Sequence, residues 1–572
     1  MKIHPEHSIQ PALSNLPISC VFSTCWSGCF PTRDTWMRSI RAAILATSLL
    51  AAVFFSAAAL GDPPVPWTAA EPFHFTMADS LGRDPNAPPE PPGQKASNPP
   101  EGKGDGAATQ SDRGKKKDQE AEGGEKSDQA DDDHENPATP QCCNLHAQTT
   151  VVAQGDPGFP AKYSGPNSLN SAGERQETLA ADLFAGVRLW DGAEMHADAL
   201  MWQGFGLSDT FGIEAFSNGD AYKAGTNIPD FMLARWFVRQ TIGLGGEQED
   251  VPDGQLTLAG KQDISRLTFT FGRFTPTDMF DNNTYAKDAH TQFLNWAMCS
   301  NLAWDFPSDS VGYTTGVAVE LNQPKWALRY GFFQMPGMMN GFTAEDAIFK
   351  WPAEGSDGIF TRSWGMMTEL ERRWKLDDHP GAIRFMAWLD QADMASFSVA
   401  TALLQANPPP QDAPQGAGST IPPAAFAYRY KYGFGLSWEQ EVNKNLGLFS
   451  RVGWNDGHEV AWTYTDANWS ASLGAAIKGE RWKRPDDTVG VAGVLSGASR
   501  DQQEFLKAGG TGILNGDGNL NYGWEGALET YYDFPIAKSA HFTMDYQFVG
   551  DPAFNRDRGP VSIFAVRLHW EE

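Results

Sequence analysis

The chain has 572 residues and a formal net charge of −27 at pH 7, and this acidic balance argues against nucleic-acid binding, which needs a basic surface. Its mean hydropathy is −0.41, and no apolar run after residue 62 approaches the roughly 20 residues that a membrane-spanning helix needs. A spanning β-strand also gives a polar profile, because every second residue can face water. The 20 Trp, 35 Phe and 57 Gly therefore suit a membrane barrel and a large secreted β enzyme equally.

The cysteines predict neither a disulfide framework nor a metal site. There are six, too few and too scattered for a framework, and no Cys/His cluster has the spacing of zinc ligands. They are Cys20, Cys25, Cys29, Cys142, Cys143 and Cys299. We expect no metal and no cofactor.

Residues 1–61 are predicted to hold an upstream extension and a secretory signal peptide. Arg38 and Arg41 form a basic start, 42–55 an apolar core, and 56–59 offer small residues for cleavage. A permanent membrane anchor is the alternative, because the apolar stretch is close to the shortest that can span a bilayer.

Residues 62–141 change character and are predicted to be a disordered linker rich in Pro, Gly and charge. Stretches such as 86–92 and 114–118 contain no large apolar side chain. Such a segment cannot bury enough surface to offset the entropy lost on ordering. A tether or a tail that occludes a pore is the functional alternative.

Residues 142–572 are predicted to form one β domain, because strand-like alternation recurs along them. In the last segment, large apolar residues alternate with mostly polar ones. The apolar set is Phe564, Val566, Leu568 and Trp570, and the other set is Ala565, Arg567, His569 and Glu571. Period two places the two sets on opposite faces of a sheet. The segments have about 9–12 residues, the length of a tilted strand that crosses a bilayer. Their apolar faces begin and end with aromatic residues, as interfacial girdles do.

The alternating segments predict a closed sheet. An open sheet in lipid would leave the N–H and C=O groups of its edges unpaired. We therefore expect an all-β fold, a large antiparallel transmembrane β-barrel of about 16 strands with a disordered N-terminal extension. A barrel of this width has a water-filled lumen instead of a packed core.

Short and long connections alternate along this domain. Tight turns are predicted at 190–192, 322–324, 442–445 and 535–538, and long loops rich in Gly, Pro and Asp at 407–423 and 481–517. In bacterial barrels the short turns face the periplasm and the long loops face the outside.

Ordered blocks between residues 144 and 560 carry a family resemblance. The densest is GRFTPTDMFDNNTYAKD at 272–288, followed by TQFLNWA at 291–297, and the others lie at 144–150, 163–169, 204–208, 235–241, 312–316 and 547–560. Together these blocks resemble the carbohydrate-selective porins of the OprB type. The resemblance implies a 16-stranded barrel in the outer membrane of a Gram-negative cell, through which small carbohydrates such as glucose diffuse without energy coupling. It implies the lipid bilayer and the barrel-insertion machinery as partners, and it leaves monomer and homotrimer both open.

The chain departs from the family pattern in a few places. His290 stands where the resemblance leads us to expect Arg, Cys299 is unusual, and the chain ends in Trp570-Glu571-Glu572 instead of on an aromatic residue. The segment before the barrel is also longer than the family needs. The His290 difference could alter selectivity.

Inward-facing charged residues are the first candidates for the pore wall. A pore for neutral sugars needs hydrogen-bonding groups and aromatic platforms that bind weakly, so that the solute can leave. Strand parity places acids and bases on the same inner face, where they would form ladders. The candidates are Arg235, Arg239, Arg266, Arg329, Arg451, Glu320, Glu525 and Glu529, with Arg188, Asp182, Glu194 and Asp198 beside them. For each residue the alternative is a scaffolding role.

The block 278–296 is the candidate for a constriction. It follows a strand end and is long enough to fold inward as a loop. Its candidate sugar contacts are Asp278, Asp281, Asn282, Asn283 and Trp296. The alternative is a self-packed outer loop with Asx turns. The run 281–283 lacks the Gly and distal Glu of a calcium loop, so it predicts no metal site.

A barrel enzyme is the first rival function. Glu525 and Glu529 would lie about 13 Å apart along a strand, beyond the roughly 5–9.5 Å that glycosidases use. The sequence also contains no Gly-x-Ser-x-Gly elbow. We therefore expect no enzyme and name no catalytic residue. A porin for organic acids, aromatic compounds or an exported polysaccharide remains an alternative, as does a surface adhesin; the mixed inward charge does not favour an anion pore.

Overall fold

A computed structural model describes residues 140–221, 225–337, 339, 362–408 and 420–572. The expected signal peptide at 1–61 and nearly all of the expected linker at 62–141 lie outside the described residues.

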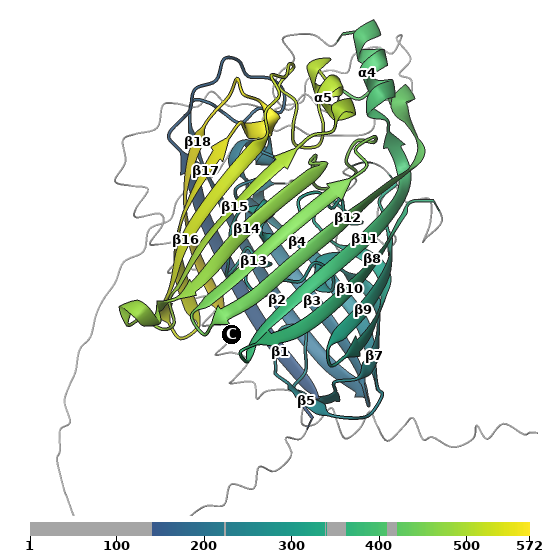
Figure 1. Cartoon of the computed structure of the whole chain (residues 1–572), viewed down its shortest axis with the longest axis vertical. Helices are drawn as coiled ribbons and strands as arrows, with labels where there is room; N and C mark the ends of the chain where they lie inside the picture. The colour runs from purple at the N-terminus through teal and green to yellow at the C-terminus, as the bar shows by residue number, and fades with distance from the viewer. Residues whose placement is uncertain (1–139, 222–224, 338, 340–361, 409–419) are drawn as a thin grey trace, which may run out of the picture. The chain divides into compact units, whose positions relative to one another are not determined.

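The described residues form a closed antiparallel barrel of sixteen strands, which confirms the predicted fold and strand number (Figure 1). Neighbouring strands follow the chain order, and the last strand pairs with the first from Gln148 opposite Glu571 to Gly155 opposite Phe564. The barrel strands are β1 (Cys143–Asp156), β2 (Glu174–Trp190), β3 (Ala193–Gly204), β4 (Thr226–Gly243), β7 (Arg266–Phe274), β8 (Thr314–Gln323), β9 (Trp326–Gln334), β10 (Trp364–Leu376), β11 (His379–Ala395), β12 (Phe426–Asn443), β13 (Leu446–Asn455), β14 (Trp469–Lys478), β15 (Thr488–Gly497), β16 (Glu525–Ala537), β17 (Ala540–Gly550) and β18 (Val561–Glu571). A separate two-stranded sheet, β5 (Gln248–Val251) with β6 (Gly260–Asp263), lies in the connection between β4 and β7.

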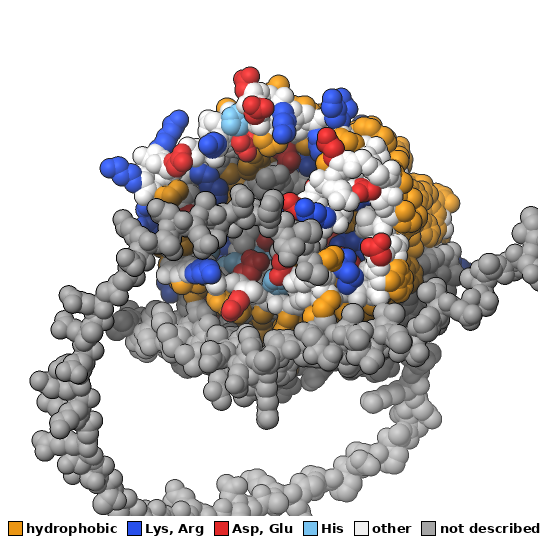
Figure 2. All heavy atoms as spheres, turned by 90° about the horizontal axis from the view of Figure 1, so that it is seen from below, with side chains coloured by type: hydrophobic (Ala, Val, Ile, Leu, Met, Phe, Trp, Pro, Cys, Tyr) orange, Lys and Arg blue, Asp and Glu red, His pale blue; other side chains and the backbone are white. Residues whose placement is uncertain are grey.

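The two faces of the strands differ as the alternation predicts. On β12, Tyr430 is 57% exposed on the outer face, whereas the neighbouring Lys431 is 1% exposed on the inner face. Figure 2 shows hydrophobic side chains on the outer wall and charged side chains around the opening at one end of the barrel. An outer surface of large apolar side chains fits a wall in contact with lipid.

The helices of the described residues are short. They are α3 (Trp296–Cys299), α4 (Phe397–Ala406) and α5 (Arg500–Lys507), with 3-10 turns η1 (Leu207–Thr210), η2 (Pro276–Asp278), η4 (Pro423–Ala425), η5 (Gly479–Trp482) and η6 (Pro552–Phe554). In the described part of the chain, no helix has the length and apolarity needed to cross a bilayer. The two longest, α4 and α5, pack together at the end of the barrel that carries the long loops (Figure 1).

The connections sort into a turn end and a loop end, as predicted. Two-residue turns join β2 to β3, β8 to β9, β12 to β13 and β16 to β17. They lie within the predicted turns at 190–192 and 442–445, and overlap those predicted at 322–324 and 535–538 by one residue each. The predicted loop at 481–517 is wrong in part, because it contains β15 and α5. The reason lies in the composition of β15: Val491 is 41% exposed on the outer face and Ala492 is 2% exposed on the inner face, so both faces are apolar and no polar alternation marks the strand.

The lumen is also less open than predicted, because part of it is a packed core. The ring of Phe293 lies 5.4 Å from Phe449 of β13 and 4.9 Å from Tyr531 of β16, with edge-to-face geometry in both pairs. Phe293 belongs to the connection between β7 and β8, so this connection fills one side of the barrel.

Candidate functional site

Residues 275–313, here called the constriction loop, fold into the barrel, as one of the two sequence interpretations proposed. The inner face of β13 receives this loop with Gly447, Phe449, Arg451, Gly453 and Asn455. Glycine is required at 453, because a side chain there would collide with Asn301 of the loop. The alternation of small and large residues along β13 therefore positions the loop against one wall.

Arg451 fixes the loop electrostatically. Its guanidinium lies 2.9 Å from the Asp281 carboxylate and donates to the backbone carbonyls of Asp281, Ala286 and Met298 at 2.7–3.1 Å. The side chain is only 2% exposed. A buried guanidinium with a paired carboxylate and three carbonyl acceptors is well satisfied, so this contact anchors the loop.

Two inward glutamates of β16 anchor the loops through their backbones. Glu529 accepts hydrogen bonds from the amides of Leu294 and Asn295, at 2.6 and 3.0 Å. Glu525 accepts three more from loop amides, those of Glu214, Ala215 and Ala553, at 2.7–2.9 Å. Both side chains are almost completely buried.

Four candidates from the sequence are thus buried where the barrel wall meets the loops that fold into it. They are Asp281, Arg451, Glu525 and Glu529, and in the described part of the chain none of them lines a main cavity of the lumen. Their geometry corresponds to the scaffolding alternative and not to direct contact with a solute.

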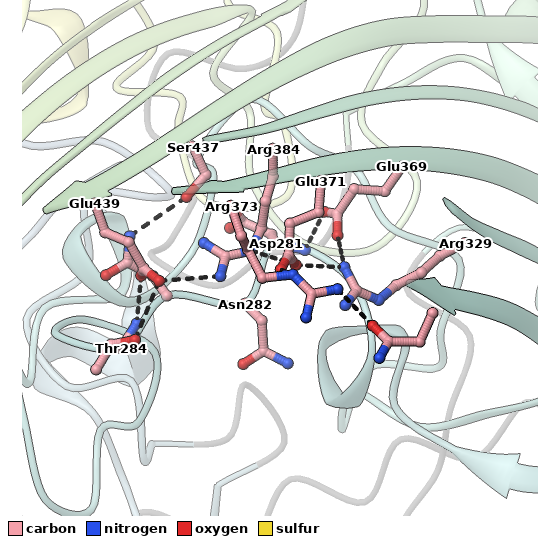
Figure 3. Close-up of polar contacts among 12 residues, drawn as sticks. Asp281, Asn282, Thr284, Arg329, Glu369, Glu371, Arg373, Arg384, Ser437 and Glu439 are labelled. Carbon is pink, nitrogen blue, oxygen red and sulfur yellow. Dashed lines mark hydrogen bonds and ion pairs between the residues drawn. The ribbon is translucent and has the colours of Figure 1, made fainter. Parts of the chain in front are cut away.

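A second group of inward charges forms a ladder along β8 to β12, and Figure 3 shows its part from Arg329 to Glu439. Arg329 lies 2.6 Å from Glu320 and 2.8 Å from both Glu369 and Glu371. Arg384 bridges Glu371 and Glu439, at 3.0 Å from each. We call this set, with Arg373 beside Glu371, the charge ladder.

Sequence reasoning missed most of this ladder, although a signal was present. Glu369, Glu371 and Arg373 alternate along β10 with the same parity that identified Arg329 on β9. The far end of the ladder also holds the constriction loop, because Glu439 accepts from the backbone amide of Thr284 at 2.7 Å.

The constriction loop leaves a cavity of about 510 Å³ against the wall of β1 to β4, here called the constriction cavity. Charged residues line one part of it. Arg235 of β4 donates two hydrogen bonds of 3.0 Å to the Asp278 carboxylate and one of 2.6 Å to Asp198. This fork geometry fixes both partners. The predicted candidates Arg239, Asn282 and Trp296 line the same cavity.

Aromatic rings line another part of the constriction cavity. Trp296 lies 5.5 Å from Phe216 and 5.1 Å from Tyr464 in stacked geometry, and Tyr464 stacks on Phe306 at 4.3 Å. Phe216, Phe306 and Tyr464 were not identified from the sequence. They reach the cavity from the loops 205–225, 275–313 and 456–468, whose meeting no local pattern reveals.

Two further cavities lie toward the turn end. One, of about 490 Å³, is lined by the predicted residues Arg266, Glu320 and Arg329 and shares Arg239, Asp278 and Asn282 with the constriction cavity. The other, of about 710 Å³, shares His290 with it. The shared lining residues place the constriction cavity next to both of these cavities.

His290 lies between two carboxylates at the edge of the constriction cavity. Its ring nitrogens are 3.0 Å from Asp220 and 2.8 Å from Asp288. Burial alone would lower the pKa of His290, but the two carboxylates raise this pKa well above its ordinary value. The described residues contain no group of three or more His, Cys, Asp and Glu arranged to hold a metal ion.

We expect the charge of this cluster to change at alkaline pH. Because the pKa of His290 is raised by folding, its stabilising ion pairs are fully present below about pH 6.5, the usual value for histidine, and are lost as the pH rises through the higher folded pKa. The cluster then passes from net −1 to net −2. Reversal potentials in a KCl gradient should move toward cation preference as the pH rises. His290→Gln should show this preference at neutral pH already, and His290→Arg should remove the pH dependence; a pH-dependent His290→Arg channel would contradict the assignment.

Comparison with known proteins shows the family of this chain and supports its fold. The family model described as "Carbohydrate-selective porin, OprB family" matches residues 166–571. The high-pH structure of Pseudomonas putida OprB matches at 16% identity with a TM-score of 0.57, covering 75% of this chain and 94% of that one. Its low-pH structure matches at 12% identity and TM-score 0.39, covering 75% and 93%, and the outer-membrane channel DcaP of Acinetobacter baumannii at 8% and 0.40, covering 75% and 97%. No curated protein matches the sequence.

Proposed function

Because the chain belongs to the OprB family of carbohydrate-selective porins, we propose that its solutes are small neutral sugars that pass through the constriction cavity. The protein is an outer-membrane β-barrel through which carbohydrates diffuse passively. The sugar is selected in the constriction cavity, by the side chains that line it.

The observation that carries the proposal is the mixed lining of the constriction cavity. Arg235 is paired with Asp278 and Asp198, His290 lies between Asp220 and Asp288, and the cations Arg239 and Lys287 also line the cavity. Paired charges of opposite sign give no strong preference for either ion but offer many hydrogen-bonding groups for hydroxyls. The aromatic rings beside them match the weakly apolar face of a sugar ring.

We also infer that the barrel has no catalytic role. The carboxylates that could nominally act as acid and base, Glu525 and Glu529, both accept hydrogen bonds from loop amides. These contacts support a structural use of both groups. Purified protein that hydrolyses an oligosaccharide or a lipid would contradict this inference.

We further propose that the barrel-insertion machinery inserts this protein into the outer membrane. The protein is then either a monomer or a homotrimer. Native electrophoresis of the purified protein, with and without cross-linking, distinguishes the two oligomeric states.

Liposome swelling tests the solute proposal. Reconstituted protein should admit glucose faster than a disaccharide, an amino acid or gluconate. Equal entry of solutes of equal size would contradict sugar selection while leaving a pore, and faster entry of gluconate would favour the organic-acid alternative.

The charge ladder provides a variant for the same assay. Arg329→Ala leaves Glu320, Glu369 and Glu371 without their shared cation, so the lumen becomes more negative. We expect glucose entry to change roughly two- to fivefold, which corresponds to about 0.5–1 kcal/mol, and cation preference to rise. Ser562→Ala is the matched control, because Ser562 shares the outer face of β18 with the exposed Phe564. Equal behaviour of the two variants would contradict a role for the ladder.

A further inference from the structure

The connection between β4 and β7 is unlike the other connections at the turn end. Residues 244–265, here called the turn-end hairpin, contain the β5–β6 sheet, paired from Gln248 opposite Asp263 to Val251 opposite Gly260. Figure 1 shows β5 below the barrel, at the end opposite α4 and α5. The neighbouring strand pairs are joined by two residues only, as between β2 and β3 or β8 and β9.

The hairpin reaches along the barrel wall to the first strand. Asn144 of β1 donates to the backbone carbonyls of Gly254 and Thr257, at 2.8 and 2.9 Å. Ala259 exchanges two hydrogen bonds with Gln141, which precedes β1: its amide donates to the side chain at 2.7 Å and its carbonyl accepts from the amide at 3.0 Å. Because β2 and β3 separate β1 from β4 in the barrel, the hairpin crosses the ends of both.

The tip of the hairpin enters the solute path. Gln255, Leu256 and Thr257 line the constriction cavity together with Arg235, Asp278 and Trp296. Gln255 donates to Gln148 on the inner face of β1 at 2.8 Å, and the Leu256 carbonyl accepts from Arg239 at 2.9 Å. The constriction cavity therefore has the constriction loop on one side and the hairpin tip on its turn-end side.

We propose that the tip of the turn-end hairpin, at Gln255, Leu256 and Thr257, is a second selectivity element that sets the upper size of the sugars that leave the constriction cavity. This inference rests on the proposed function. The hairpin has its own attachment to the barrel wall. Its tip is bound to β1 and β4, whereas the constriction loop is anchored on β13 and β16.

The chemistry of the tip indicates that it selects by size. Its three side chains are an amide, an aliphatic group and a hydroxyl, none of which carries charge. Two acidic groups of the hairpin are bound outside the tip: Glu249 to Arg266 at 2.7 Å, and Asp253 to Asn144 at 2.8 Å. A neutral tip leaves charge preference to the wall and narrows the path by its volume.

The base of the hairpin gives a defined point for a deletion. The amide of Leu244 donates to the carbonyl of Ser265 at 2.8 Å, and Gly245 and Gly246 both have positive φ, +82° and +105°. Deleting residues 247–264 joins Gly246 to Ser265 and leaves a two-residue Gly-Gly turn, which suits a β-hairpin. We expect the single-channel conductance of this variant to rise roughly twofold, because the path at the exit widens, and the ratio of disaccharide to glucose entry to rise with it.

A point variant tests the opposite direction and does not depend on the deletion folding. Gln255→Trp enlarges the tip, so it should lower glucose entry and bring the disaccharide rate to the background of empty liposomes. Asp250→Trp is the matched control, because Asp250 lies on the outer side of the hairpin with its side chain 84% exposed. It should behave as the parent protein. Migration with and without heating on a denaturing gel reports whether each barrel has folded.

The outcomes separate this inference from the function on which it rests. If the parent protein does not favour glucose, the proposed function fails. If the parent favours glucose but Gln255→Trp keeps the parental disaccharide-to-glucose ratio, the hairpin tip is not a selectivity element, and a folded deletion variant with parental conductance would lead to the same conclusion.

Discussion

Replacing Arg451 by methionine is expected to detach the constriction loop from the barrel wall. The change leaves the Asp281 carboxylate, which is 7% exposed, without its cation and removes the donor for three loop carbonyls. Breaking a buried ion pair from one side costs about 3–5 kcal/mol. We expect a lower thermal unfolding midpoint, a larger and noisier single-channel conductance, and loss of the preference for glucose.

A second variant separates the charge from the packing. In Arg451→Met combined with Asp281→Asn, no uncompensated carboxylate remains, so part of the lost stability should return. The same substitution at the exposed Arg481 serves as the control and should leave stability and conductance unchanged. Parental stability and conductance in Arg451→Met alone would show that Arg451 does not anchor the loop.

Arg451 also shows how much of the site the sequence can predict. Strand parity was sufficient to place Arg451, Glu525 and Glu529 inside the barrel, because period-two alternation decides the face of every strand residue. It could not decide which inward residues meet water. That depends on the path of the constriction loop, which follows β13 because Gly453 leaves room for Asn301, a long-range fit that alternation does not encode.

The wrong part of the fold prediction also comes from a contact between distant segments. Alternation between polar and apolar residues predicts a strand, and β15 lacks this alternation because its inner face packs on the loop core instead of facing water. The inward residues of β10 follow the same parity that identified Arg329, so the sequence was sufficient to predict them as well. By contrast, the aromatic part of the cavity joins side chains from three separate loops, which no spacing within one segment could bring together.

Trp296 is a sequence candidate that lies in the constriction cavity, and its contact with a sugar stays a prediction. It was a candidate for stacking on a sugar ring, and it lies in the constriction cavity at the centre of the aromatic group, between Phe216 and Tyr464. Trp296→Ala removes the largest apolar surface of this lining. An aromatic contact contributes about 0.5–1.5 kcal/mol, so glucose should block the ion current with an affinity up to roughly tenfold weaker.

Two further variants make this result specific to the aromatic surface. Trp296→Phe keeps a flat ring in the cavity and should retain most of the affinity. Trp524→Ala makes the same change at a tryptophan that is 57% exposed and packs on Trp469 outside the cavity, so it should bind glucose as the parent does. Current-block titrations compare the three. Equal affinities in Trp296→Ala and Trp524→Ala would mean that sugars cross the cavity on its charged groups alone, because the aromatic rings would then contribute only to the packing of the loops.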